Sequence, residues 1–483
     1  MTRNEVEALR AGIRAVDAAV SHRATNPPNP SEIYAPSHHI AALDPDNALV
    51  VGIRGVGKSF WAGALGDPAA RSVAMAAYPR LNLARYLVSF GFTGDEGGEA
   101  PSPATTQRYS VDAAAAKLFW RIVVLRAFAK AANISIPSSY GELLRVYEDP
   151  EVRESLMRDA DVVLESRDTR LLLLFDALDT LASDWQRLRL LTKALLEVTY
   201  AMRSYRTLRL KLFLRPEQLD DPAVGFTDLS KLKAAKIDLT WDSDDLFGLF
   251  FTRVANDPTS KAAFAELARG QQIVWVSDGT VSLPPQLTRN AAVQERMFVQ
   301  LAGRYMGADH RKGKTFTWLP AHLADGFGVV TPRSFLKALR EAAVKSDASE
   351  DRVLTIDGIK EGLRAASRLR VEQIKEEYQW IEWALEPLAG LRVPCTENEI
   401  VQRWEESDTA DTIDRDAKQK GYLAPSEMPT GDPLVTDFRE VGLLNTLQKI
   451  GVLQRRADGR INMPDIFRIG AALIGRGRVA PEG

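Results

Sequence analysis

The sequence is poor in cysteine, in net charge and in long apolar runs, and each shortage narrows the classes of protein that fit it. The single cysteine, Cys395, excludes a disulfide within the chain and a metal site built from several cysteines. A formal charge of −2 provides no overall basic field for nucleic acid, so any such contact needs a local patch. No apolar run approaches the roughly 18–20 residues of a membrane span. The N-terminus, MTRNEVEALRAG, lacks the apolar core of a secretion signal, and we expect a cytoplasmic protein with no membrane partner.

The most informative stretch that is present covers residues 48–65 and reads ALVVGIRGVGKSFWAGAL. Its first apolar residues, 49–51, predict a short buried strand, and the apolar residues after Ser59 predict a helix. The loop between them, GIRGVGKS, has the form G-x-x-x-x-G-K-[ST], which in this strand–loop–helix context is the P-loop pattern. The sequence therefore predicts a site for the phosphates of a nucleotide.

Each residue type in this loop has a physical reason to be there. Glycines let successive backbone N–H groups turn towards a phosphate, and the helix that starts at the loop directs its positive end towards the anion. Lys58 has the length to reach the outer phosphates, and the Ser59 hydroxyl is a ligand for Mg²⁺. The residues expected to bind nucleotide are Gly52, Arg54, Gly55, Val56, Gly57, Lys58, Ser59 and Phe60.

A second motif, RLLLLFDALDT at residues 170–180, predicts a buried parallel strand that ends in an acid. In open α/β sheets, ligands bind at the carboxyl ends of the strands, which is where Asp176 would lie. Asp176 is therefore predicted to hold Mg²⁺, together with Ser59, in the Walker B arrangement. Asp179 is predicted to orient or deprotonate the attacking water.

Two further apolar segments complete an alternating order of strands and helices. Residues 208–214 predict a strand that stops at Arg215, and residues 236–241 predict another strand. If the first lies beside the acid-tipped strand, Arg215 faces the terminal phosphate, where it would sense that group and stabilise charge during transfer. The alternative is an ordinary surface arginine at a strand end. The order predicts an α/β fold, in which helices cover both faces of a parallel sheet.

Together, GIRGVGKS, LLLLFDALD and LFLR resemble the additional-strand P-loop ATPases, namely the AAA+ proteins and their bacterial STAND and KAP relatives. The resemblance covers roughly residues 35–345. It implies ATP and Mg²⁺ as cofactors and a sensing role for Arg215. No guanine-specifying N-K-x-D follows, which favours ATP over GTP. These relatives often carry a further acid after the second aspartate, and Thr180 departs from that pattern.

Helical patterns predominate after residue 242, which resembles the small lid domain of the AAA+ class. Thr331 and Pro332 predict the start of a helix, with Arg333 in its first turn. By resemblance to the second sensor of AAA+ proteins, Arg333 would contact the phosphates. The alternative is an exposed arginine at a helix start. ATP held between sheet and lid would make the angle between these domains depend on the nucleotide.

The C-terminal part predicts a helix at residues 441–450, a hairpin around the Asp458-Gly459 turn and a helix at residues 465–474. This order resembles the end of a winged helix, a module that contacts DNA or docks other proteins. The hairpin is basic, so it would touch the phosphate backbone of DNA without reading sequence. The candidates for this contact are Arg455, Arg456 and Arg460.

We therefore expect five segments along the chain. These are an N-terminal helix with an approach segment (1–34), a P-loop ATPase core (35–242), a helical lid (243–350), a connecting helix (351–393) and a winged-helix-like domain (394–483). Within the core, residues 88–110 are rich in glycine, proline, serine and acids, and this composition predicts a flexible loop.

Three functions fit these features. The first is an ATP-binding and hydrolysing switch that rearranges its domains, forms a homo-oligomer and passes the change to an effector protein. The resemblance links such bacterial proteins to antiphage defence or mobile elements. The second is an ATP-dependent loader or regulator on DNA, similar to archaeal origin-recognition proteins. The third is a scaffold that binds nucleotide and hydrolyses it slowly.

Overall fold

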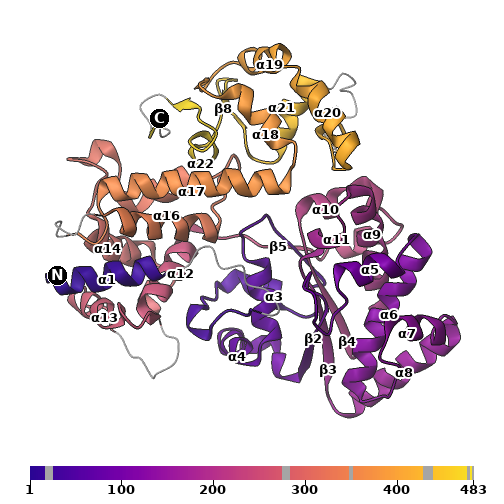
Figure 1. Ribbon diagram of the computed structural model, residues 1–483. Coiled ribbons are helices and arrows are strands. Elements are labelled where there is room, and N and C mark those ends of the chain that lie inside the picture. The colour runs from indigo at the N-terminus through magenta and orange to yellow at the C-terminus, as the bar shows by residue number, and fades with distance from the viewer. Residues whose placement is uncertain (17–25, 275–282, 347–351, 428–438, 476–478, 481–483) are drawn as a thin grey trace. The chain divides into compact units, whose positions relative to one another are not determined.

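The computed structural model describes residues 1–16, 26–274, 283–346, 352–427, 439–475 and 479–480, which fold as two compact units (Figure 1). The first, here called the sheet unit, contains the described parts of Ser21–Pro30 and Ala35–Leu239. The second, the helical unit, contains the described parts of Met1–Val20, Ser31–Tyr34 and Thr240–Gly483. The N-terminal helix therefore belongs to the same unit as the C-terminal half of the chain.

A five-stranded parallel sheet forms the centre of the sheet unit, in the order β2-β3-β4-β1-β5 (Figure 1). Strand β4 lies between β1 and β3, since its Leu212 pairs with Leu49 on one side and with Phe175 on the other. The fold class is thus α/β with a P-loop parallel-sheet core, as the sequence predicted. The strands are β1 (Leu49–Val51), β2 (Tyr86–Phe92), β3 (Arg170–Phe175), β4 (Leu208–Leu214) and β5 (Ile237–Asp238).

Helices cover both faces of this sheet, which explains why its central strands are apolar at nearly every position. Helices α6 and α9 pack on one face and α3 on the other. Every side chain of β1 is buried, and so are those of β3 from Leu171 onwards. The helices of this unit are α2 (Ile40–Leu43), α3 (Lys58–Gly66), α4 (Pro68–Ala77), α5 (Pro103–Tyr109), α6 (Ala113–Ala132), α7 (Tyr140–Val146), α8 (Pro150–Ser166), α9 (Trp185–Met202), α10 (Pro216–Asp220) and α11 (Leu229–Lys233).

The loop predicted at residues 88–110 is wrong at both ends, because only residues 93–102 and Ser110 lie outside helix and strand. Most of β2 falls in this stretch and pairs along β3, with Ser89 opposite Leu173, and α5 follows. The composition of the whole window concealed the alternation of Val88, Phe90 and Phe92, and pairing with a neighbouring strand decides the structure of such a segment. The predicted strand at residues 236–241 is shorter than expected, because only Ile237–Asp238 pairs with β1.

Lys211 is a fully buried cation in the middle of β4, with 0% of its surface exposed. Its Nζ atom donates hydrogen bonds to the carbonyl oxygens of Ala42 (2.9 Å), Asp44 (2.9 Å) and Asn47 (2.6 Å), which fix the turn that leads into β1. Burial lowers the pKa of Lys211 to about 7, although the negative charges of Asp44 and Asp46 oppose this shift.

The substitution Lys211→Met tests this effect. Between pH 7 and pH 10 the unfolded chain holds the Lys211 proton and the folded chain releases it, so folding becomes more favourable as the pH rises. We expect the free energy of unfolding of the wild type, relative to that of the variant, to rise by up to about 1.4 kcal/mol per pH unit. Urea unfolding at several pH values measures it. If the difference in free energy of unfolding between wild type and variant did not change with pH, the three carbonyl groups would be keeping the Lys211 ammonium group charged.

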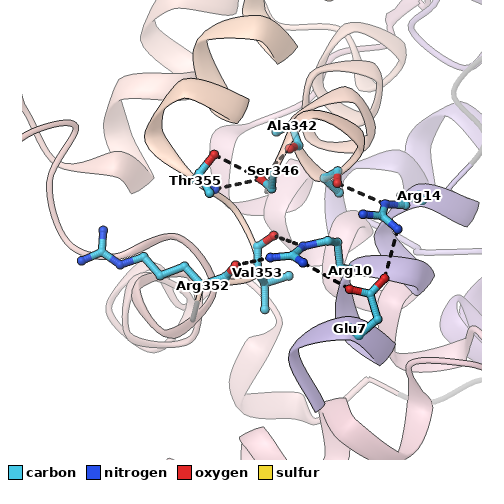
Figure 2. A network of polar contacts seen from close by, with 9 residues as sticks. Glu7, Arg10, Arg14, Ala342, Ser346, Arg352, Val353 and Thr355 are labelled. Carbon is cyan, nitrogen blue, oxygen red and sulfur yellow. Dashed lines mark hydrogen bonds and ion pairs between the residues drawn. The ribbon is translucent and has the colours of Figure 1, made fainter. Parts of the chain in front are cut away.

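In the helical unit, α1 (Arg3–Ala15) is fixed to residues far along the chain, as Figure 2 shows. The side chain of Arg10 is buried and donates to the carbonyl oxygens of Arg352 (2.6 Å) and Val353 (3.2 Å). Arg14 donates to the carbonyl oxygen of Ala343. Glu7 lies between the two arginines, 3.2 Å from Arg10 and 3.1 Å from Arg14. These contacts tie α1 both to α16 and to the residues that precede α17.

Helices α16 and α17 pack very closely because α17 presents glycines to its partner. A Cβ atom on Gly358 would lie 2.6 Å from the carbonyl oxygen of Ala342, and one on Gly362 would lie 2.1 Å from that of Ala338. Only glycine fits at such distances. The larger helices of this unit, after α1, are α12 (Ser243–Asn256), α13 (Lys261–Gly270), α14 (Ala291–Ala302), α15 (Thr315–Leu323), α16 (Pro332–Lys345), α17 (Ile356–Glu377), α18 (Ile381–Leu385), α19 (Glu397–Glu406), α20 (Thr409–Lys420) and α21 (Glu440–Lys449).

The C-terminal part contains α21, an antiparallel hairpin of β7 (Gln454–Arg455) and β8 (Ile461–Asn462), and α22 (Asp465–Arg468). The helix predicted at residues 465–474 is much shorter, because Ala472 takes a left-handed conformation (φ 58°) and the chain turns into β9 (Ile474–Gly475). Strand β9 pairs with β6 (Arg392–Val393). Cys395 is buried beside the hairpin, and burial raises the pKa of its thiol to about 11, so it is a packing residue.

Candidate nucleotide site

The parallel sheet brings the predicted site residues of the sheet unit to one edge. Strands β1, β3 and β4 are adjacent and parallel, so their carboxyl ends lie together. The loop of residues 52–59 follows β1, Asp176 follows β3 and Arg215 follows β4. The loop and Asp176, which are more than a hundred residues apart in the sequence, therefore lie close together in the fold.

Glycines give the loop its shape at three positions. Gly55 (φ 82°) and Gly57 (φ 110°) have positive φ angles that disfavour other residues, and Gly57 is the N-cap of α3. Gly52 is needed for space, since a Cβ atom there would lie 2.6 Å from Val56. The Gly52 amide also donates to the carbonyl oxygen of Leu214 at the end of β4 (3.1 Å), which fixes the start of the loop.

Lys58 lies over its own loop and donates hydrogen bonds to the carbonyl oxygens of Gly52 and Ile53. The other predicted contacts differ in burial. Val56 is buried beneath the loop, whereas Arg54 is partly exposed. Phe60, also partly exposed, lies edge-on to the buried Trp61 with 5.4 Å between ring centres. The loop therefore presents mainly backbone and the Lys58 ammonium group to a ligand.

Ser59 and Asp176 meet at the start of α3. Their side chains form a hydrogen bond, and only 5% of the Asp176 surface is exposed. Burial raises the pKa of Asp176, while hydrogen bonds from Ser59 and the Ala177 amide and the charge of Lys58 oppose the rise. A hydroxyl and a carboxyl oxygen in contact are a donor set that suits Mg²⁺, and a bound cation would favour the ionised carboxylate. The residues present thus fit the metal that the sequence predicted.

Asp179 and Arg215 form an ion pair across the ends of β3 and β4. Asp179 lies on a short 3-10 turn (Leu178–Thr180) that begins after Ala177, whose φ of 53° turns the chain sharply. The Arg215 side chain is 12% exposed, and its Nη1 atom also lies 3.8 Å from Glu217. The two residues predicted to activate water and to sense the terminal phosphate are therefore in direct contact with each other.

Sequence reasoning missed the loop that follows β2. Gly94 (φ 75°) packs so closely on the Asp176–Thr180 turn that a Cβ atom would lie 2.6 Å from Thr180 Oγ1 and 3.1 Å from Ala177 Cβ. The Asp176 amide donates to the carbonyl oxygen of Phe92. The signal that was available is the alternation of apolar residues up to Phe92, which indicates a strand whose end reaches the same edge.

The remaining predicted residues lie in the helical unit. Arg333 is in the first turn of α16, where the N-cap Thr331 accepts a hydrogen bond from the Ser334 amide. Its contact with phosphates stays a prediction. On the β7–β8 hairpin, Arg455 pairs with Glu397 (2.6 Å) and Arg460 with Asp458 (2.7 Å). Arg456 is exposed on the same hairpin.

The described residues contain no helix with both the length and the apolarity needed to cross a membrane.

Together, the parallel sheet and the glycine loop define the class of fold, an α/β protein with a P-loop core.

No protein-family model matches the chain, and no curated protein matches it. Among solved structures, it is similar to the Aeropyrum pernix ORC2 protein (ADPNP–ADP complexes), with 12% identity and a TM-score of 0.31 over 92% of this chain and 98% of that one. It is also similar to the Aeropyrum pernix ORC1 protein in complex with DNA, with 14% identity and a TM-score of 0.31 over 89% of this chain and 90% of that one. Likeness at this level carries no statement about function.

Proposed function

We propose that the sheet unit binds ATP with Mg²⁺ and hydrolyses it, and that the chain uses the bound nucleotide as a switch. The observation that carries this proposal is the position of β4 between β1 and β3. Because of it, the glycine loop, the Ser59–Asp176 pair and the Asp179–Arg215 pair share one edge of the sheet. Loop, metal ligands, water-activating acid and phosphate sensor are the parts that phosphoryl transfer to water requires.

In this proposal the loop amides and the first turn of α3 bind the phosphates. Lys58 leaves the carbonyl groups of its own loop and donates to the outer phosphates instead. Ser59 and Asp176 hold Mg²⁺, which supplies positive charge to the phosphate oxygens when bound. We also propose Arg333, in the first turn of α16, as a further phosphate-binding residue, the role predicted from the sequence.

The ion pair between Asp179 and Arg215 suggests how binding leads to hydrolysis. While the two are paired, the guanidinium group of Arg215 binds the Asp179 carboxylate, which is then not available to hold the attacking water. A terminal phosphate carries more negative charge than a carboxylate and competes for the guanidinium group. Asp179 is then released to orient water. ADP, which lacks that phosphate, leaves the pair intact, so the same arginine distinguishes the two nucleotides.

We further propose that the switch acts through self-association and an effector protein, in the manner of the STAND relatives and of antiphage defence systems. Contact with DNA is less favoured, because two of the three hairpin arginines already pair with acids of the same chain. DNA would have to displace Glu397 and Asp458, which reduces the gain from each phosphate contact.

The substitution Lys58→Ala tests the binding step. Removing a cation that donates to the outer phosphates should weaken the binding of ATP with Mg²⁺ by at least about 100-fold. Isothermal titration calorimetry measures the change. Lys130→Ala is the matched control, since Lys130 is an exposed lysine of α6 in the same unit and its removal should leave affinity unchanged. Wild-type affinity in Lys58→Ala would contradict the assignment of the loop.

The substitution Asp179→Asn tests hydrolysis separately from binding. The amide keeps the size of the side chain but loses the charge that orients and accepts a proton from water. We expect ATP affinity within about threefold of the wild type and a turnover lowered by 100-fold or more. Release of phosphate measures turnover. Equal turnover in both proteins would favour the slow-hydrolysis scaffold.

The substitution Arg215→Ala tests the sensor. Without the guanidinium group, the preference for ATP over ADP should fall by about tenfold, because ADP makes no contact that the variant loses. Competition binding with both nucleotides measures this preference. Arg158→Ala, at an exposed arginine of α8 outside the site, provides the control. An unchanged preference in Arg215→Ala would remove Arg215 from the sensing role.

A further inference from the structure

A pocket lies in the sheet unit, and none of its lining residues belongs to the candidate nucleotide site. It has a volume of about 560 Å³ and is formed by α6, α9 and the beginning of α8. Sites for small molecules typically measure about 300–1,000 Å³. Its walls combine small and aliphatic side chains with six charged ones. The apolar residues are Ala113, Ala114, Leu118, Leu190 and Ala194, and the charged ones are Lys117, Arg121, Glu148, Arg153, Lys193 and Glu197.

Positive charge in this pocket exceeds negative charge. Lys117 and Glu197 form an ion pair, so they neutralise each other. Within the part of the chain that the structure describes, Arg121 and Lys193 make neither a hydrogen bond nor an ion pair, although both line the pocket and are only partly exposed. Cations are costly to hold in such a place without a counter-charge. Both side chains are therefore available to an anion.

Arg153 is the third lining cation that forms no ion pair with a described residue. Glu148 is the only described lining acid outside the Lys117–Glu197 pair, so the four cations and two acids leave a net charge of +2. Arg153 is almost completely buried, with 8% of its surface exposed. Its Nη1 atom donates to the carbonyl oxygens of Tyr147 (2.8 Å) and Glu148 (3.1 Å). Its Nε atom is buried and has no partner among the described residues. Leaving a buried donor without an acceptor destabilises the fold, so natural proteins seldom retain one without a reason.

The charges around Arg153 indicate what is missing. Burial lowers its pKa, and the positive charge of Arg121 lowers it further, while Glu154 and Asp149 offset part of this effect. Arg121 and Arg153 repel each other, and the Nε atom of Arg153 has no acceptor in the described part of the chain. An anion bound between the two side chains would offset both costs. Leu118 and Leu190 also line the pocket, and an inorganic ion would leave their aliphatic surfaces exposed to water. The ligand should therefore carry an apolar part that covers them.

We propose that this pocket binds a small organic anion, in which a phosphate or carboxylate group is carried on an apolar stem. Arg121, Lys193 and Arg153 bind the anionic group, and Leu118 and Leu190 bind the stem. The pocket lies on helices that also pack on the sheet, but its occupancy requires no nucleotide, so this proposal stands independently of the ATPase proposal.

The test uses the full chain with Lys58→Ala, which removes competition from the phosphate-binding loop. Two probes, 4-fluorophenyl phosphate and 4-fluorobenzoate, are titrated and followed by ¹⁹F NMR, with inorganic phosphate as a competitor. We expect saturable binding of at least one probe. Inorganic phosphate lacks the apolar stem, so it should displace that probe only at a concentration at least tenfold higher than that of the probe. Tighter binding of the phosphate probe would assign a phosphate ester, and tighter binding of the benzoate would assign a carboxylate.

Variants then locate the binding. Arg121→Ala and Lys193→Ala should each weaken the binding of the tighter-binding probe by about tenfold, because each removes one charge-assisted hydrogen bond. Arg80→Ala, which removes the same charge from an exposed arginine outside the pocket, should leave binding unchanged. Arg153 is left intact because its carbonyl contacts support the turn before α8. No saturable binding, or equal binding by Arg121→Ala and the unsubstituted pocket, would overturn the proposal.

Discussion

The structure depends on one geometric constraint, which is that β4 fits between β1 and β3 in a fixed parallel register. Leu212 pairs with both neighbours, so a shift of one residue in β4 would displace Arg215 relative to both the loop and the acid-tipped strand. The buried Lys211 helps to set this register, because its three hydrogen bonds attach β4 to the turn ahead of β1. The contact of the loop with Asp176 and that of Asp179 with Arg215 follow from this arrangement of three strands.

The charged groups of the candidate site are paired within the protein before any ligand is considered. Lys58 donates to loop carbonyl groups, Ser59 bonds to Asp176, and Arg215 is held by Asp179. Such pairing offsets the cost of placing charges at a partly buried edge. It also means that a ligand must exchange these partners and not merely add contacts. Selectivity then comes from whether a ligand offers better partners than the protein does.

The local parts of this site were predictable and the long-range parts were not. The loop after β1 and the acid after β3 each follow an apolar run directly, so the pattern of neighbouring residues was sufficient to find them. The β2 strand was missed because its stability comes from pairing with β3, and because the glycine-, proline- and acid-rich residues that follow it give the window of residues 88–110 the composition of a loop. Nothing in the sequence near Arg10 indicates that its hydrogen-bond acceptors are Arg352 and Val353, since those contacts arise only from tertiary packing.

The end of the sheet unit offers a physical route from the loop to the rest of the chain. Leu239 is the last residue of that unit, and its amide donates to the carbonyl oxygen of Val51 (2.7 Å), the last residue of β1. A Cβ atom on Gly52 would lie 3.4 Å from that of Leu239, so the first residue of the loop and the exit from the unit are in contact. Because Thr240 continues directly into the helical unit, any movement of the loop that the proposed nucleotide switch requires would act on the covalent connection itself. The proposed switch would then need no long series of contacting side chains to transmit the state of the loop.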